Sequence, residues 1–419
     1  MILRITAVLL IPVLCLCSDG KVPDKLLEAA RKGDAQSQVR VAAEYFSGRN
    51  RIVNPHLGAY WFRKAAESGN AFARYNYALC CLNGWGVKKS PQTAFLWLER
   101  AAGQSFVPAQ IQHAEMLFTG VAAEESDEYH FPAIASDRES ALKTLRKLAV
   151  SGNPAASGKL AGLLLSVPEL RESAASEIRT AASFAASKLK REPEIILLYA
   201  TVLQNGIGGA SDMKTAAALL DSIADISPEA MAQLADFHEF GFGVPIDRRK
   251  ALELTVKAAS AGNPRAKIAL GNRHLEGNGV EHDPAAAFKL FEEAWQTGYP
   301  MSSSALGKCY LNGIGTKQDT GRAFELFLMG ANSGDPESQY RLGICFMDAV
   351  GTRQDVKSGA YWLKIASQNS HIEAAREYAI CLLEGKGVPV DRRQAAALLR
   401  RAAAGGDVKA VEILNRESI

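Results

Sequence analysis

The sequence lacks the motifs by which common enzyme classes are recognised. Its 419 residues contain no H-E-x-x-H zinc motif, no G-x-S-x-G nucleophile elbow, no phosphate-binding P-loop and no G-x-G-x-x-G dinucleotide fingerprint. Its paired glycines end predicted helices rather than begin them, so they cannot hold a phosphate at a helix N-terminus. We therefore predict no catalytic residue, no cofactor or metal site and no enzymatic activity.

The sequence also lacks an excess of charge of either sign. It has 48 Lys and Arg against 45 Asp and Glu, and its basic runs are short pieces such as Lys188–Arg191 and Arg248–Lys250. Nucleic-acid binding requires a clustered basic face, so no nucleic-acid partner is expected. With 47% hydrophobic residues the chain is too apolar to be disordered, and its length predicts several domains or one elongated array.

Long apolar runs are missing except at the N-terminus. Arg4 precedes an apolar stretch, Ile5–Cys17, and polar residues follow it. This pattern predicts a secretory signal peptide over residues 1–18 and hence an exported protein, periplasmic or secreted; the alternative is a buried N-terminal helix. A lipid anchor at Cys17 is a second alternative, although Leu16 is not the small residue that such a signal requires. The stretch is too short for a transmembrane span, and none is expected elsewhere.

What the sequence does contain is a repeat of 36 residues. Gly241, Gly277 and Gly313 follow one another at that step. A second register holds a small residue, preceded in nine of ten cases by an apolar or aromatic one, at ten places: Ala42, Ala78, Ala114, Ala161, Ala200, Ala235, Gly271, Gly307, Gly343 and Ala379. A small residue in the middle of a helix lets a second helix approach closely.

The spacing inside one unit is helical. Ala266, Leu270 and Leu275 recur at steps of three to five, and Gly277 then supplies the positive φ that a helix C-terminus favours. A second apolar stripe follows after Pro284, so each unit is a helix–turn–helix. Such pairs bury their apolar faces only against their neighbours. The sequence therefore predicts an all-α fold, an α/α superhelical solenoid of about ten repeats.

These residues carry a family resemblance. Gly271-x-x-His274-x-x-Gly277-x-Gly279, followed by Ala287 and Ala294, resembles the SEL-one-like repeat, a relative of the tetratricopeptide repeat. The match recurs over about 35–407. The resemblance implies a superhelix that mediates protein–protein contacts, whose members often act as adaptors in signalling or envelope assembly.

Departures from the repeat predict the organisation of the chain. Units 1–3 span 24–153 and contain an 11-residue excess within the insertion 124–137; 154–193 is a degenerate repeat that has lost its turn glycines. Units 5–10 span 194–407, and 408–419 forms a capping helix.

Cysteine and histidine occupy packing positions of the repeat. Cys80, Cys309, Cys345 and Cys381 lie two residues after the small position, and Cys81 is adjacent to the first of them. We expect buried free thiols, because stacked helices lie about 8–10 Å apart, beyond disulfide reach. His238 and His274 stand where other units have tyrosine, and a packing role is favoured over a metal pair.

A partner is expected on the first helix of each unit, which usually lines the concave face of such superhelices. Its candidate contacts are polar or aromatic residues near the small position, together with aromatic residues of the acidic insertion; ordinary solvated surface is the alternative for both. The candidates are Arg40, Arg74, Tyr75, Asn76, Gln112, Tyr129, His130, Phe131, Tyr340, Arg341 and Arg376.

The sequence thus favours a scaffold or adaptor of the cell envelope, or a secreted one, that binds a protein or peptide of unknown identity. Two alternatives stay open. One is a secreted hydrolase of the cysteine-rich kind, against which the missing second-helix cysteines weigh; the other is a purely structural spacer.

Overall fold

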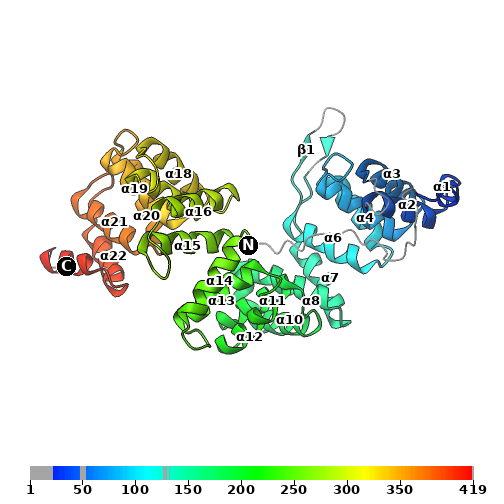
Figure 1. Ribbon diagram of the computed structural model, residues 1–419, viewed down its shortest axis with the longest axis horizontal. Coiled ribbons are helices and arrows are strands. Elements are labelled where there is room, and N and C mark those ends of the chain that lie inside the picture. The colour runs from blue at the N-terminus through cyan, green and yellow to red at the C-terminus, as the bar shows by residue number, and fades with distance from the viewer. Residues whose placement is uncertain (1–21, 48–52, 126–129, 132, 418–419) are drawn as a thin grey trace. The chain divides into compact units, whose positions relative to one another are not determined.

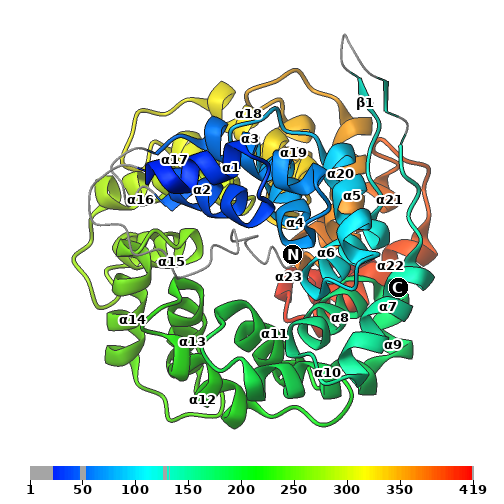
Figure 2. The same ribbon diagram turned by 90° about the vertical axis from the view of Figure 1, so that its right-hand side faces the viewer.

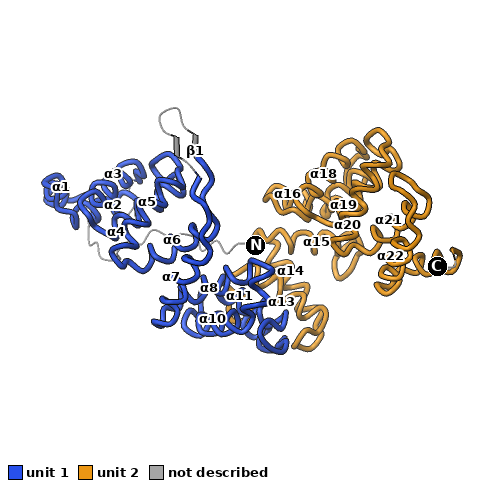
Figure 3. The backbone as a smooth tube through the Cα atoms, turned by 180° about the vertical axis from the view of Figure 1, so that it is seen from behind, with its two compact units in different colours: residues 1–219 blue, residues 220–419 orange. Residues whose placement is uncertain are grey.

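The computed structural model describes residues 22–47, 53–125, 130–131 and 133–417, and it is built almost entirely of helices (Figure 1). The chain divides into two compact units, residues 1–219 and 220–419 (Figure 3). Within each unit, consecutive helices pack against one another in chain order. The prediction of an all-α helical repeat fold is confirmed.

The helices alternate between two structural roles. The first helices of the ten repeats are α2 (Ala35–Ser47), α4 (Ala71–Asn83), α6 (Val107–Thr119), α8 (Pro154–Ser166), α11 (Pro193–Gln204), α13 (Pro228–Phe240), α15 (Pro264–Glu276), α17 (Ser302–Asn312), α19 (Pro336–Asp348) and α21 (Ile372–Glu384). The second helices are α3 (Pro55–Glu67), α5 (Pro91–Ala102), α7 (Arg138–Val150), α10 (Ala175–Lys188), α12 (Met213–Ile223), α14 (Arg248–Ser260), α16 (Pro284–Gln296), α18 (Thr320–Asn332), α20 (Val356–Gln368) and α22 (Arg392–Ala404). Helices α1 (Asp24–Arg31) and α23 (Val408–Glu417) precede and follow the array.

The small residue of each repeat lies buried in its first helix, as predicted. In α17 this residue is Gly307, and a Cβ atom added to it would lie 2.5 Å from Cε1 of Phe327 on α18. Phe327 is fully buried. The two helices of the repeat therefore touch through a backbone and an aromatic ring, an approach that a larger residue would prevent.

Specific residues cap both ends of the helices. Five second helices of unit 2 start at an aspartate that recurs every 36 residues and accepts hydrogen bonds from backbone N–H groups of the first turn: Asp247, Asp283, Asp319, Asp355 and Asp391. The first helices of unit 2 end at a left-handed residue, which is glycine in α15 (Gly277, φ 68°) but Ala349 in α19 (φ 58°). The repeat thus keeps its turn even where glycine is replaced.

The irregular repeats lie in unit 1. The insertion forms an antiparallel ribbon of β1 (Glu124–Glu125) and β2 (His130–Phe131), extended by a bridge between Val121 and Ile134. The ribbon stands away from the neighbouring helices of unit 1 (Figure 2). In the next repeat, a short helix, α9 (Pro168–Ser173), replaces the glycine turn between α8 and α10. These two features are the departures that the uneven repeat spacing indicates.

The cysteines are part of the core. All five that follow residue 21 are buried and free, which confirms the expectation from the repeat register. Burial raises the pKa of the Cys80 thiol to about 12 and that of Cys309, Cys345 and Cys381 to about 11. These thiols are therefore protonated at neutral pH and act as small apolar side chains.

The contact between Gly307 and Phe327 predicts a measurable coupling. Gly307→Ala should lower the free energy of unfolding by about 1–3 kcal/mol, because its Cβ overpacks the ring. The tenth repeat carries Ala379 and Leu399 at the two corresponding positions. The double variant Gly307→Ala/Phe327→Leu should therefore be more stable than the sum of the two single losses predicts. Chemical denaturation followed by circular dichroism measures all three variants, and strictly additive losses would contradict this packing.

Candidate partner-binding surface on the first helices

The first helices of unit 2 share one accessible side, which we call the A-face. In each first helix it consists of three residues, defined relative to the small residue: the one six positions before, the one two positions before and the one directly after. These three positions lie on one side of a helix. All fifteen are at least partly exposed, whereas the small residues between them are buried. They are Glu229, Gln233 and Asp236; Arg265, Ala269 and Asn272; Met301, Ala305 and Lys308; Glu337, Arg341 and Ile344; and Glu373, Glu377 and Ile380.

Ion pairs join the A-face from one first helix to the next. Arg265 of α15 pairs with Asp236 of α13, and Lys308 Nζ of α17 lies 2.9 Å from Glu337 Oε1 of α19. Partners on neighbouring repeats must be adjacent in space for such contacts to form. The A-face is therefore continuous from α13 to α15 and from α17 to α19.

Glu337 is the most heavily paired carboxylate of the A-face. Its oxygens lie 2.9 Å from Lys308 Nζ, 2.8 Å from Arg341 Nε and 3.0 Å from His371 Nε2. Burial raises the pKa of Glu337, but the hydrogen bonds from His371, Lys308 and Arg341 outweigh it and hold the pKa well below its ordinary range. The carboxylate is therefore ionised at neutral pH and fixes three side chains from three helices.

His371 connects this cluster to α21. The backbone N–H of Ala374 donates to His371 Nδ1 (3.3 Å), so Nε2 carries the proton that is donated to Glu337. The imidazole stacks on Tyr340 with ring centroids 4.7 Å apart, and the guanidinium of Arg341 lies 5.3 Å from the Tyr340 ring centroid. Tyr340 is thus held between two groups that restrict its orientation.

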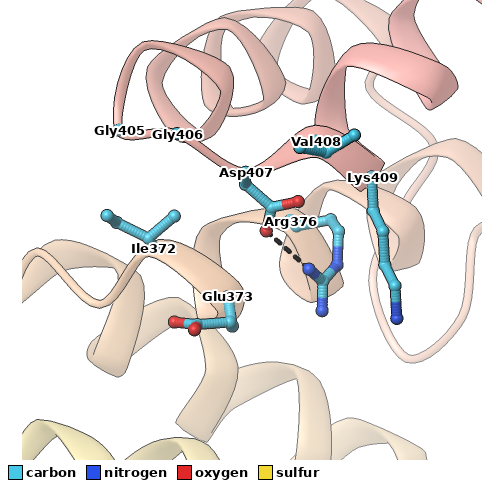
Figure 4. Close-up of a pocket in the computed structure, with 8 residues that line it drawn as sticks. All are labelled: Ile372, Glu373, Arg376, Gly405, Gly406, Asp407, Val408 and Lys409. Carbon is cyan, nitrogen blue, oxygen red and sulfur yellow. Dashed lines mark hydrogen bonds and ion pairs between the residues drawn. The ribbon is translucent and has the colours of Figure 1, made fainter.

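A shallow pocket of about 310 Å³ lies beside this cluster, between α21 and the start of α23 (Figure 4). Ile372 and Glu373 line one side, and Gly405 and Gly406 line the other. Arg376 pairs with Asp407 within the pocket and also with Glu377 on its own helix. Since ligand pockets typically range from about 300 to 1,000 Å³, this one has room for a single side chain of a partner.

The structure brings together only some of the predicted contact residues. Tyr340 and Arg341 belong to the Glu337 cluster, and Arg376 lies one helix further along at the pocket. The charges of Arg341 and Arg376 both act on the Tyr340 hydroxyl, although burial is the largest effect and raises the pKa of Tyr340. These three residues of unit 2 therefore form one neighbourhood.

In unit 1 the predicted residues are more scattered and more buried. Arg40 is exposed, and Gln112 is half-buried and donates to Glu115. Arg74 donates to Gln104 Oε1 (3.0 Å), and Tyr75 is buried against Phe106. Asn76 is fully buried and donates to the carbonyl oxygen of Phe72, so the structure does not place it on the surface.

The structure describes only part of the predicted contact residues of the insertion. Tyr129 lies outside the described residues. The backbone of His130 and Phe131 forms strand β2, which pairs with β1. The side chains of these two residues lie outside the described part of the structure. Their proposed contact role stays a prediction.

Three residues of the cluster were not singled out by sequence reasoning: Lys308, Glu337 and His371. One of them does carry a sequence signal. His371 caps α21 at a place where Asn70, Asn263 and Asp335 cap other first helices, so it departs from the repeat in a polar position. For Lys308 and Glu337 no such signal exists, since charged residues are common on any exposed helix face.

The chemistry of this surface is that of recognition. Within the described ranges no group of three or more His, Cys, Asp or Glu side chains could hold a metal ion. Among those same residues, no helix has the length and apolar content to cross a membrane. The A-face offers fixed charge and oriented hydrogen-bonding groups, and Tyr340 next to it adds one aromatic ring; such groups are typical of protein interfaces.

Comparison with known families gives a match over more than half of the chain. The Sel1 repeat model matches seven segments: 35–70, 71–106, 228–263, 264–294, 300–335, 336–371 and 372–407. The stretch between the second and third segments holds the ribbon and the repeat with α9. The match thus begins and ends at the helix pairs that the structure defines.

One solved structure shows the same architecture, and a second is similar in sequence. A protective antigen from uropathogenic Escherichia coli strains, described as displaying an SLR fold, is 24% identical with a TM-score of 0.52, over 93% of this chain and 81% of the antigen. A Sel1 repeat protein from Oxalobacter formigenes is also 24% identical, with a TM-score of 0.48, over 63% of this chain and 99% of its own. At this identity the first likeness shows the architecture alone.

The pairing of Glu337 predicts how stability depends on pH. Because its pKa is lowered in the folded state, its contribution is present above the ordinary glutamate pKa of 4.5 and is lost as pH falls below that value. Glu337→Gln should cost about 1 kcal/mol at pH 7, a figure reduced for the partial exposure of the pairs. Thermal or chemical unfolding at pH 7 and pH 3 should show a smaller acid-induced loss for the variant. An equal loss in both proteins would contradict the assignment.

Proposed function

Since the chain belongs to the Sel1 repeat family, whose members are generally protein-interaction scaffolds, we propose that it is a scaffold that holds a protein partner on the A-face of unit 2. Family members are typically non-enzymatic, and we extend this to the present chain. The partner is a protein or an extended peptide whose identity the surface alone does not specify.

The observation that carries the proposal is the regularity of the A-face. At the same three positions on five successive helices the side chains are accessible, while the small residue among them is buried in every case. Repeat proteins use such extended, rigid surfaces for binding. In two repeats of unit 1, the residue two positions before the small residue is buried; these residues are Asn76 and Lys159. Unit 2 is therefore the better candidate for the binding surface.

Tyr340 and Arg341 supply the features of an interaction hot spot. Tyrosine and arginine are enriched among residues that dominate binding energy, partly because an oriented side chain loses little entropy on binding. Here the ring of Tyr340 is fixed by His371 and Arg341, and Arg341 is fixed by Glu337. The cluster therefore presents a preformed contact point.

We expect affinity capture with the full chain, followed by mass spectrometry, to recover a partner that Tyr340→Ala/Arg341→Ala loses by about tenfold or more. A matched control is Tyr60→Ala/Lys64→Ala on α3, which removes another tyrosine–cation pair, with Lys64 Nζ 5.8 Å from the ring centroid. Melting temperatures of both variants verify folding. Equal recovery by the A-face variant and wild type would refute the proposal.

A deletion of residues 124–137 belongs in the same experiment. Loss of a partner on deletion would assign a contact role to the ribbon, and unchanged recovery would remove the ribbon from the binding surface. The deletion removes the N-cap Asp137 of α7 and the core contact of Ile134, so its melting temperature is compared with that of the wild type to verify folding.

We further propose that the chain is exported, to the periplasm or the medium, on the strength of the signal-like residues 1–18. Expression in a bacterial host should yield a shortened chain outside the cytoplasm. Intact mass measurement gives the cleavage site, and an added acyl mass at Cys17 would indicate a lipid anchor. A full-length chain in the cytoplasmic fraction would overturn the export proposal.

A further inference from the structure

The second helices of the last two repeats carry positive charge alone. Helix α20 has Lys357 and Lys364, and α22 has four arginines, at 392, 393, 400 and 401; neither helix contains Asp or Glu. The first helices α19 and α21 hold acidic residues on the A-face instead. Charge is therefore segregated between the two kinds of helix at this end of unit 2.

Four of these cations share one position pattern, and we call them the cation grid: Lys357, Lys364, Arg393 and Arg400. Lys357 corresponds to Arg393, and Lys364 to Arg400, at the 36-residue step. All four are exposed. The three preceding second helices serve as internal comparisons, because the same two positions hold Arg249 and Val256, Ala285 and Glu292, and Gly321 and Leu328. The grid is thus a property of two adjacent repeats and not of the repeat in general.

The grid is held in place, and its side chains are not engaged in ion pairs among the described residues, although Lys357 interacts electrostatically with the carboxylate of Asp355, which caps α20. Arg401 of α22 donates to the carbonyl oxygen and to Oγ of Ser367 on α20, each at 2.7 Å, so the two helices lie side by side. Elsewhere on α22, Arg392 lies 3.4 Å from Glu417. Within the described part of the chain, none of the four grid side chains makes a hydrogen bond or ion pair. Unpaired exposed cations at fixed spacing form a surface ready for anionic groups.

We propose that the cation grid binds an extended acidic segment of a partner protein, with a carboxylate at about every third residue. The grid cations of each helix are seven residues apart, which is about 10 Å along the axis. In a polyproline II conformation, an extended chain has three residues per turn and rises about 3.1 Å per residue, so carboxylates at every third residue lie on one side about 9 Å apart and reach both cations of a helix. The arginines can form two parallel hydrogen bonds with each carboxylate.

Other anionic partners fit the grid less well. A membrane-surface helix inserts an apolar stripe among the lipids, but Leu363 and Leu399 are buried in the core, and the single exposed ring of Tyr361 on α20 does not form a stripe. Nucleic-acid binding typically neutralises about six to ten phosphates, more than the four grid cations provide. The proposal concerns the second helices and stands independently of the A-face.

The test is fluorescence anisotropy with the full chain and a labelled synthetic peptide that carries glutamate at every third position between Gly and Ser. Binding is expected, weakening as salt is raised, and Arg393→Glu/Arg400→Glu should raise the Kd by about tenfold. The matched control Arg249→Glu/Lys257→Glu changes the net charge equally on exposed positions of α14 and should leave the Kd within about twofold. A peptide of the same composition with contiguous glutamates should bind more weakly.

Three outcomes would overturn the proposal. The first is absence of binding to the spaced peptide at low salt. The second is an equal loss of binding in the α14 control, which would mean that net charge alone acts. The third is tighter, grid-dependent binding to phosphatidylglycerol vesicles or to a single-stranded oligonucleotide, which would assign the grid to a different class of partner.

Discussion

The two helices of each repeat meet where a residue with little or no side chain faces a large one. Gly307 and Phe327 form such a contact in the eighth repeat, and in the tenth repeat Ala379 and Leu399 take their places. Because this contact uses one side of each helix, the other sides remain available. The accessible A-face and the cation grid both follow from that constraint.

The two available surfaces differ in their electrostatics. On the A-face, acidic and basic residues alternate and pair across neighbouring helices, so that Glu337 alone orients Lys308, Arg341 and His371. On α20 and α22, none of the four grid side chains makes an ion pair within the described residues, although Arg392 of α22 pairs with Glu417. A paired network favours a preformed contact with defined geometry, whereas unpaired charge favours attraction and rapid association. The two proposed modes of recognition therefore differ between the first and second helices of the repeats.

The sequence predicted the fold in detail wherever the repeat is regular. The ten small positions, the turn glycines and the proline or aspartate at helix starts each reflect a local requirement that is visible in a single residue type. Two features were indicated only as departures: the ribbon at 124–137 and the short helix α9, which replaces a glycine turn with Val167 and Pro168. Their form depends on packing that the repeat pattern does not encode.

The binding surface was less predictable than the fold. Register alone grouped Tyr340, Arg341 and Arg376 correctly on the first helices, because helical spacing determines which side a residue occupies. The same register grouped buried residues with exposed ones, since Tyr75 and Asn76 of unit 1 and Arg376 of unit 2 are all buried. Burial depends on what a neighbouring repeat carries, and a single repeat does not show it. Likewise, the role of Glu337 arises from three partners on three helices.

The central claim, that a partner covers the A-face, is tested most directly by oxidative footprinting of the chain in complex with its captured partner. Met301 on the A-face and Met329 on the second helix α18 are comparably exposed, at 54% and 49%. Oxidation of methionine follows solvent access, so each reports on its own side of the helix pairs. The account predicts that the partner strongly slows oxidation of Met301 and leaves that of Met329 unchanged. Protection of Met329 alone, or of neither residue, would contradict it.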